Sequence, residues 1–478
     1  MKITNTGKII KRVALIRPGT YLEGLVVPLG LLYIAGYLSS KMPDIEIAII
    51  DAALEDLDQG EILEKVRAFN PELVGLSGLT VHTDEIKDTA KNIRKVFPET
   101  VVVAGGPAAT SNYIEILKEH SVNAGVLGEG EETFYQIVRT LQEGKEISTL
   151  NGLVFLDQEG KVCVNSERKL IENLDEIPSP AYHLISVKDY IHSSKRNSQS
   201  PIYISSRNLP ILSSRGCPYK CIYCHKTLGK SFRARSSSSV VDEIIWLKQT
   251  YNIEELEFID DIFNFDKVRA KEIFRKLADA NLNLKISFPN GIKYEMVDTE
   301  LLELFKKSGV YRLAFGIESG NPRIQKVIRK MIDLHKMRNI IEQSANMGFF
   351  VSGFFQLGIP SETKEEMLDT VRFATSTKLH TAMFHLTIPF PGTQIYEEHI
   401  RGKIKTDNYE SARRISVNLS AVSDEELLKI KRYALYKFYI NFNRIIRLYK
   451  VFPVKKRLLL NFINVLSEIF LKKWIVQT

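Results

Sequence analysis

Three cysteines on one short stretch constrain this chain more than any other feature. Cys217, Cys221 and Cys224 follow the spacing CxxxCxxC, and they are three of the four cysteines in 478 residues. Thiolates are the usual protein ligands of iron–sulfur clusters, and three of them can hold three irons of a 4Fe–4S cluster. The remaining iron is then open to a ligand from outside the protein. The spacing therefore predicts a cluster on a single loop.

A zinc site and a disulfide are the alternatives to a cluster at the three cysteines. A zinc site normally needs a fourth Cys or His, which His225 supplies in principle. A disulfide is disfavoured because the chain contains so few cysteines. The fourth cysteine, Cys163, alternates with apolar neighbours in Lys161-Val-Cys-Val164, so we expect a small buried side chain there and no ligand.

The cysteine loop belongs to a series of strand–helix units that runs over residues 201–400. A strand pattern around Ile202–Ile204 resumes after a polar stretch, and from Ile211 six β-rich runs alternate with helical patterns. Such a series predicts an open, partial (β/α)6 barrel whose functional residues gather at the carboxyl ends of the strands. The cysteine loop follows the first of these strands.

Polar residues stand at the ends of the other strands of this series. They are Asp260 and Asp261, Asn290, Glu318 and Ser319 within Gly316-Ile-Glu-Ser-Gly320, and Gln356. A carboxylate in such a place is a good partner for an ammonium group of a ligand. An acid or serine after a strand also caps the helix that follows, and both roles stay open.

Residues 1–150 predict a separate doubly wound, Rossmann-like α/β domain. Five β-rich runs alternate with helical patterns between residues 13 and 127, which favours a parallel sheet covered on both faces. Ligands of such sheets bind at the carboxyl strand ends, where small residues let the backbone approach them closely. Those ends carry Ser77 and Thr80, then Gly105 and Gly106, and then Gly128, Glu129 and Gly130.

The motifs of the second half resemble those of the radical S-adenosylmethionine superfamily. Ser214-Arg-Gly216 precedes the CxxxCxxC motif, and the aromatic Tyr223 precedes its last cysteine. The resemblance implies that S-adenosylmethionine chelates the open iron and is cleaved to a 5'-deoxyadenosyl radical. It also implies cofactor contacts for Tyr223 beside the cluster or adenine, for Asp260 and Asp261 at the amino group, and for Glu318 and Ser319 at the ribose and methionine. Asn290 and Gln356 are candidates for contact with cofactor or substrate because of their places at strand ends.

The first half resembles the cobalamin-binding domain that precedes many radical S-adenosylmethionine enzymes. The similar features are the helix start Pro28-Leu-Gly-Leu31, the turn Gly105-Gly-Pro107 and the loop Gly128-Glu-Gly-Glu131. This resemblance implies cobalamin contacts from Ser77, Thr80, Gly105, Gly106, Gly128, Glu129 and Gly130. The Asp-x-His-x-x-Gly signature that supplies a histidine to cobalt is absent, and His82 is expected to be a surface or loop residue.

Together these resemblances imply a class B radical S-adenosylmethionine methyltransferase-like enzyme that uses a 4Fe–4S cluster, S-adenosylmethionine and cobalamin. The expected reaction is methyl transfer to an unactivated carbon of a small-molecule or lipid substrate, with electrons from a flavodoxin or ferredoxin. One alternative is a radical cyclase or carbon–carbon bond-forming enzyme, for example on a lipid. Another is a cofactor-binding sensor without turnover. No side chain is assigned a catalytic role.

The remaining segments are a connector and a basic tail. Residues 151–200 predict a hairpin followed by a linker, and residues 401–478 predict a helical region that opens at Ser423-Asp-Glu-Glu426. Residues 429–478 hold twelve Lys or Arg and one acid, whereas the whole chain has a net charge of +8. Apolar residues at Leu459–Phe470 favour packing on the body or contact with an anionic membrane surface over nucleic acid. With no signal-peptide core and no membrane-spanning apolar run, we expect a cytoplasmic protein.

Overall fold

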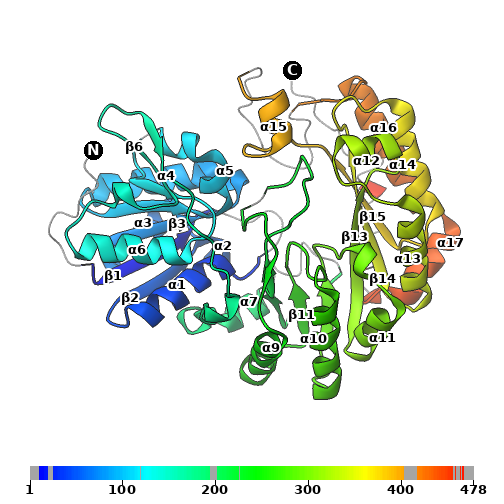
Figure 1. Ribbon diagram of the computed structural model, residues 1–478, viewed down its shortest axis with the longest axis horizontal. Coiled ribbons are helices and arrows are strands. Elements are labelled where there is room, and N and C mark those ends of the chain that lie inside the picture. The colour runs from blue at the N-terminus through cyan, green and yellow to red at the C-terminus, as the bar shows by residue number, and fades with distance from the viewer. Residues whose placement is uncertain are drawn as a thin grey trace. The chain divides into compact units, whose positions relative to one another are not determined.

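The computed structural model describes residues 10–19, 25–118, 120–193, 202–225, 227–402 and 417–455, with Leu458, Ile463, Leu466 and Ser467. It forms two compact units (Figure 1). The first is Met1–Arg196 with His225–Gly229, and the second is Asn197–Cys224 with Lys230–Thr478. Most of the predicted apolar stripe at 459–470 lies outside the described residues.

The first unit is built on a seven-stranded sheet in the order β2-β1-β3-β4-β5-β6-β7. Its first five strands are parallel: β1 (Arg12–Arg17), β2 (Glu46–Asp51), β3 (Leu73–Ser77), β4 (Val101–Gly105) and β5 (Ala124–Val126). The strand order reverses between β1 and β3. In doubly wound sheets this switch point, at the carboxyl ends of the strands, is where ligands bind.

Two layers of helices cover the sheet of the first unit, because its strands are apolar on both faces. The helices α1 (Leu29–Lys41) and α6 (Glu131–Gln142) share one core with Val13, Leu15 and Val103. The helices α3 (Gln59–Phe69), α4 (Thr83–Val96) and α5 (Gly106–Leu117) share the other with Ala14, Ile16 and Val102. A short helix, α2 (Ala52–Glu55), follows β2. The predicted doubly wound fold is confirmed.

The connector differs from its prediction because it completes the first unit. The strands β6 (Leu153–Leu156) and β7 (Val162–Val164) form the predicted hairpin, but β6 pairs antiparallel with β5 and so extends the sheet. Cys163 on β7 is half-buried, where a buried side chain was expected. Short 3-10 turns follow, η3 (Leu174–Glu176) and η4 (Tyr182–Leu184), and then α7 (Val187–His192).

A buried ion pair fastens α7 to the sheet. The Arg17 guanidinium donates from Nε to Asp51 Oδ1 at 2.7 Å and also from Nη2 to Oδ2, and both side chains are about 4% exposed. The hydroxyl of Tyr190, which is on α7, donates to the same carboxylate. Asp51 also accepts a hydrogen bond from the backbone N–H of Ala53 at the start of α2.

The second unit contains a six-stranded parallel sheet in the order β15-β14-β13-β12-β11-β8. Its strands are β8 (Asn208–Ile211), β11 (Glu255–Phe258), β12 (Lys285–Phe288), β13 (Val310–Glu318), β14 (Phe350–Leu357) and β15 (Thr381–Leu386). The helices after them are α9 (Ser237–Tyr251), α10 (Lys267–Ala280), α11 (Thr299–Lys307), α12 (Pro322–Val327), α13 (Leu334–Asn346), α14 (Lys364–Ser376) and α15 (Gln394–His399). This is the predicted partial barrel (Figure 1).

The expected strand at Ile202–Ile204 does not form. Instead, the backbone N–H groups of Ile204 and Ser205 donate to the buried carboxylate of Glu255 at 2.8 and 2.9 Å. The hydroxyl of Tyr311 donates to the other oxygen of this carboxylate at 2.5 Å. The segment thus covers the amino ends of the strands by side-chain bonds and not by sheet pairing.

Two helices end the described chain. The helix α16 (Asp424–Tyr439) starts at the predicted cap, where the Ser423 hydroxyl accepts from the N–H of Glu426, and α17 (Phe442–Val451) follows. Within the described residues we find no helix with the length and apolar character needed to cross a bilayer.

We expect Asp51→Ala to lower the free energy of unfolding by about 3–5 kcal/mol, because it leaves the Arg17 cation buried without its carboxylate. Urea denaturation followed by circular dichroism measures this change. The control is Glu55→Ala, which breaks the exposed Lys65–Glu55 pair at 2.6 Å and should cost less than about 1 kcal/mol. Equal effects of the two substitutions would contradict the assignment of Asp51 as the main fastening point.

Candidate functional site

The cysteine loop is closed at its base by a small antiparallel ribbon. The strand β9 (Ser214–Arg215) pairs with β10 (Arg233–Ala234), and the three cysteines lie in the chain between them. Gly216 begins the loop in the left-handed region, with φ of +80°. The buried carboxylate of Asp260, at the end of β11, accepts hydrogen bonds from the N–H and hydroxyl of Ser213 and from the hydroxyl of Ser214. The start of the loop is therefore tied to the neighbouring strand end.

The three sulfurs provide a donor set that suits an iron–sulfur cluster. Cys217 and Cys221 are half-buried and Cys224 is exposed. A hydrogen bond from the Cys224 thiol lowers the pKa of Cys221 and raises that of Cys224, so Cys221 is the member of this pair that favours the thiolate form that binds metal. Among the described side chains, no three Cys, His, Asp or Glu residues already stand at metal-binding distance from one another. In a 4Fe–4S cluster each thiolate binds a different iron, so the three sulfurs need not share one metal position.

An ion pair stands beside the cysteines at the end of β13. Lys330 Nζ lies 2.8 Å from Glu318 Oε1 and 3.2 Å from the Tyr223 hydroxyl, and Gln356 Nε2 donates to Glu318 Oε2 at 3.0 Å. The two charged side chains are 18% and 10% exposed. Burial opposes the charge of Lys330, but Glu318 and the sulfurs of Cys221 and Cys224 outweigh it and raise its pKa. Three of the predicted residues, Tyr223, Glu318 and Gln356, thus meet around one cation.

The backbone at Glu318 is in a conformation that side chains rarely adopt, with φ of +65°. A β-bulge in the pairing of β13 with β14 lies between Gly316 and Glu318. A side chain on Gly316 would come within 2.7 Å of Lys330 Nζ. Such local strain is retained where the surrounding contacts hold it, and here the bulge aims a carboxylate at Lys330.

The two aspartates after β11 have different surroundings. Asp260 is 1% exposed and occupied by the serines of the loop, so it positions the cysteine segment. Asp261 is exposed and accepts a hydrogen bond from the N–H of Gly216. Neither of them caps α10, whose cap is Asp266. Of the two, Asp261 is the one with room for a ligand.

Asn290 and Ser319 also differ in exposure. Asn290 is exposed and donates from Nδ2 to the carbonyl of Ile259 at 2.8 Å. Ser319 is fully buried, and its hydroxyl lies 3.1 Å from Thr370 Oγ1 and accepts from the N–H of Asn321. In this structure the Ser319 hydroxyl holds the turn together, and its expected contact with the cofactor stays a prediction.

In the first unit, the loops after β3, β4 and β5 are joined by short polar contacts. Gly106 has φ of +76°, and a side chain there would come within 2.6 Å of Ser77 Oγ. The Thr80 and Ser111 hydroxyls are 3.0 Å apart, and the N–H of Gly128 donates to Thr110 Oγ1 at 3.0 Å. These contacts gather Ser77, Thr80, Gly105, Gly106 and Gly128 at neighbouring carboxyl strand ends.

Glu129 and Gly130, the last two of the predicted cobalamin contacts, are more enclosed by the protein. Glu129 is 9% exposed. Gly130 precedes α6, and a side chain there would come within 2.9 Å of Ile34 on α1. The glycine therefore permits close packing of these two helices, which is a structural role in addition to any contact with a ligand.

His82 lies in the loop after β3, as one alternative of the prediction had it, but it is buried and not at the surface. It is 5% exposed, in the 3-10 turn η1 (Thr80–His82), and its Nδ1 accepts from the N–H of Leu79 at 3.2 Å. Burial, and then the nearby Arg17 charge, lower its pKa, so the imidazole is neutral at pH 7. The neighbouring Leu79 and Val81 are 40% and 45% exposed. They present an apolar surface at the end of β3.

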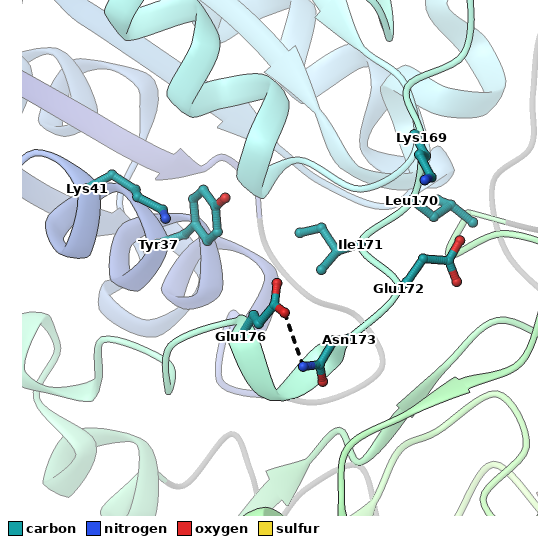
Figure 2. A pocket seen from close by; sticks show the side chains of 8 residues that line it. All are labelled: Tyr37, Lys41, Lys169, Leu170, Ile171, Glu172, Asn173 and Glu176. Carbon is teal, nitrogen blue, oxygen red and sulfur yellow. Dashed lines mark hydrogen bonds between the residues drawn. The ribbon is translucent and has the colours of Figure 1, made fainter.

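A hollow of about 340 Å³ lies elsewhere on the first unit, between α1 and residues 169–176 (Figure 2). Tyr37 and Lys41 line one side, and Glu172, Asn173 and Glu176 line the other. The Asn173 amide donates to Glu176 Oε1 at 3.1 Å. None of the predicted site residues lines it.

Comparison with known proteins places both halves of the chain. A B12 binding domain model matches residues 19–138, and a Radical SAM superfamily model matches residues 211–374. An uncharacterized methyltransferase of Pyrococcus horikoshii is 31% identical over 86% of this chain and 88% of its own. The chain is a radical S-adenosylmethionine enzyme with a B12-binding domain. The predicted family and fold class are confirmed.

Two further curated proteins and a solved structure are also similar to this chain. The cytidylyl-2-hydroxyethylphosphonate methyltransferase of Streptomyces wedmorensis is 30% identical over 78% of each chain. The anaerobic magnesium-protoporphyrin IX monomethyl ester cyclase of Rubrivivax gelatinosus is 24% identical over 82% of this chain and 69% of its own. The solved structure of OxsB with aqua-cobalamin matches 96% of this chain and 76% of that chain, with a TM-score of 0.71 at 14% identity, which supports the fold.

Sequence analysis missed Lys330, Leu79 and Val81. Lys330 is twelve residues beyond Glu318 in the chain, after α12, and no local pattern marks it. Leu79 and Val81 flank the predicted Thr80, and two large apolar residues in a loop at a strand end were an available signal.

We expect each of Cys217→Ala, Cys221→Ala and Cys224→Ala to abolish most of the iron and sulfide bound after anaerobic reconstitution, since each removes one of three thiolate ligands. Iron and sulfide assays with absorbance spectra measure this loss. Cys163→Ala is the matched control and should bind as much iron as the unmodified protein. Iron binding that survives all three loop substitutions would contradict the cluster assignment.

We expect Lys330→Met to destabilise the cluster-free protein by about 3 kcal/mol, because it leaves the Glu318 carboxylate in a mostly buried place without its cation. The double variant Lys330→Met with Glu318→Gln should recover a large part of this loss, since no charge is then left unpaired. Urea denaturation of the four proteins in the cycle gives the coupling energy. Additive losses would show that the two residues do not depend on each other.

Proposed function

We propose that this enzyme transfers a methyl group to an unactivated carbon, with cobalamin as the methyl carrier. The observation that carries the proposal is the presence of two cofactor-type sites on two units. The second unit has the cysteine loop beside Glu318 and Lys330, and the first has glycine-rich strand ends beside the exposed Leu79 and Val81. A radical reaction without methyl transfer needs only the site at the cysteine loop.

The residues of the chain act mainly by holding and orienting groups. When bound, the cluster with S-adenosylmethionine supplies a carbon-centred radical, and cobalamin supplies methyl transfer. Cys217, Cys221 and Cys224 hold the iron, and Lys330 balances the negative charge of Glu318 and the sulfurs. At the other site, Gly106 lets the backbone turn close to Ser77, and the neutral, occupied His82 is not available as a ligand of cobalt.

The proposal also includes partners. The substrate is a small molecule or a lipid with an unactivated C–H bond, and the electrons come from a one-electron carrier such as a flavodoxin or ferredoxin. The helical region near the C-terminus contacts a membrane surface peripherally, in a protein that otherwise resides in the cytoplasm. The high density of cations after Lys429 supports this last point.

A second candidate is a radical cyclase without methyl transfer. The similarity to the magnesium-protoporphyrin ester cyclase, over most of this chain, favours it. The two candidates differ in products, because methyl transfer consumes one S-adenosylmethionine for the methyl group and another for the radical. It therefore releases S-adenosylhomocysteine together with methionine and 5'-deoxyadenosine, and takes two electrons from the reductant. Cyclisation gives no S-adenosylhomocysteine.

The deciding experiment is anaerobic reconstitution with iron, sulfide and cobalamin, followed by incubation with S-adenosylmethionine and reductant. We expect bound cobalamin, and formation of both 5'-deoxyadenosine and S-adenosylhomocysteine by chromatography with mass spectrometry. 5'-Deoxyadenosine without the second product would favour the cyclase. Absence of both from the fully loaded protein would leave only a cofactor-binding sensor.

A glycine pair tests the cobalamin site separately. We expect Gly106→Ala to lose bound cobalamin but keep its iron, because the new Cβ would press on Ser77 within 2.6 Å. Gly144→Ala is the matched control: it has the same left-handed backbone, with φ of +68°, but its Cβ would meet nothing within 4 Å. Equal cobalamin binding by both variants would count against this site.

A further inference from the structure

The outer face of the last two described helices is apolar and aromatic. On α17, Phe442, Ile445, Ile446 and Tyr449 recur at intervals of three and four residues and are 76%, 36%, 40% and 54% exposed. On the preceding α16, Tyr433, Tyr436 and the adjoining Ile440 are 41–43% exposed. These seven residues, here called the outer face, form one stripe on each helix of a consecutive pair.

The opposite side of the pair is fixed to the barrel, so the outer face cannot simply turn inward. Arg444 on α17 is 2% exposed, and its guanidinium donates to the carbonyls of Leu379 and Thr375 while it lies 3.7 Å from the centre of the Phe438 ring. The Tyr439 hydroxyl donates to the carbonyl of Ala382 on β15 at 3.0 Å. The helices α14 and α16 also pack together (Figure 1).

The segment that carries the outer face has charges of a single sign. Between Leu427 and Lys455 the chain has eight Lys or Arg and no acid. Lys437 lies over the ring of Tyr433 at 5.6 Å, and Lys455 lies over the ring of Tyr449 at 4.9 Å. Cations thus stand at the edges of the apolar stripe, within reach of its aromatic rings.

Apolar side chains flanked by cations favour one kind of binding partner over the others that could cover the outer face. A second copy of the chain would bring an equally positive face, and like charges disfavour that contact. Nucleic acid would match the charge, but it offers little for the isoleucines to bury against. An anionic lipid surface matches both features, because apolar side chains enter the acyl boundary while Lys and Arg remain at the headgroups.

We propose that the outer face of α16 and α17 docks the enzyme onto anionic lipid. Phe442, Ile446 and Tyr449 enter the bilayer interface, and Lys437, Lys450 and Lys455 meet the headgroups. This inference rests on the membrane contact proposed above and does not depend on methyl transfer. It assigns that contact to described residues on the barrel unit.

Vesicle co-sedimentation of the full chain tests the proposal. We expect binding to phosphatidylcholine vesicles that contain phosphatidylglycerol, much weaker binding to phosphatidylcholine alone, and release in high salt. Phe442→Ser with Tyr449→Ser should weaken binding about tenfold or more, by the apolar area that the two rings no longer bury. Lys437→Glu with Lys450→Glu should weaken binding to the anionic vesicles specifically.

Matched controls distinguish binding through the outer face from nonspecific binding to vesicles. Val268 on α10 is 77% exposed, as Phe442 is 76% exposed, and Val268→Ser should leave vesicle binding unchanged. Lys307→Glu on α11 is the corresponding charge control, with a side chain that is 67% exposed. All variants should form 5'-deoxyadenosine in solution as the unmodified protein does, so failure of docking is distinguishable from failure of the radical reaction.

Four outcomes of binding and association measurements would overturn the proposal. Two concern vesicles: equal binding to neutral and anionic vesicles, and vesicle binding that the outer-face variants do not change. The other two are concentration-dependent dimerisation and RNA binding, if the outer-face variants abolish them. Resistance of Tyr433, Tyr436 and Tyr449 to nitration in vesicle-free, monomeric protein would show that other parts of the chain cover the face, and would overturn it as well.

Discussion

Parallel strand pairing is the constraint on which both units depend. Every strand of a parallel sheet presents its carboxyl end at the same edge, so residues that follow different strands meet there although they are far apart in sequence. In the second unit this brings Gln356 to Glu318 at 3.0 Å, and the Asp260 carboxylate to Ser213, 47 residues earlier. In the first unit it brings Gly106 against Ser77. The common direction of the strands therefore decides where both sites lie, and single residues decide only their chemistry.

Buried charges then fix the segments that the sheets do not pair. The Arg17–Asp51 pair holds α7, the Asp260 carboxylate holds the start of the cysteine loop, and Glu255 holds the segment before β8. A charge away from water is tolerated only when partners surround it, so each of these groups specifies one arrangement of its neighbours. The ion pair of Glu318 with Lys330 follows the same rule beside the cysteines. There it leaves a cation where a negatively charged cluster would bind.

The C-terminal helices follow a different logic from the rest of the chain. Elsewhere acids and bases are interspersed, whereas residues 427–455 contain no acid. The buried Arg444 is used to anchor α17, so the exposed cations and the outer face are left for contact outside the unit. Under the proposed membrane contact, such an arrangement would keep the enzyme near a lipid substrate.

The sequence by itself determined the family, the two series of alternating strands and helices, and the three cysteines. These features depend on local patterns: apolar periodicity, turn residues and the CxxxCxxC spacing. Only the tertiary structure decided between neighbours of similar chemistry. It buried Asp260 and left Asp261 exposed, and it turned the Ser319 hydroxyl into the protein while Glu318 faced Lys330.

Tertiary structure also revealed what no local pattern contains. Lys330 lies beside the cysteines because the chain returns there after α12, and the hairpin of β6 and β7 extends the first sheet because β5 leaves an edge to pair. His82 is buried, and the Arg17 charge, from the distant strand β1, lies near it. Burial and partnership are set by residues distant in sequence. A pattern read along the chain therefore finds the site, and only the packed structure shows which of its polar groups remain open to a ligand.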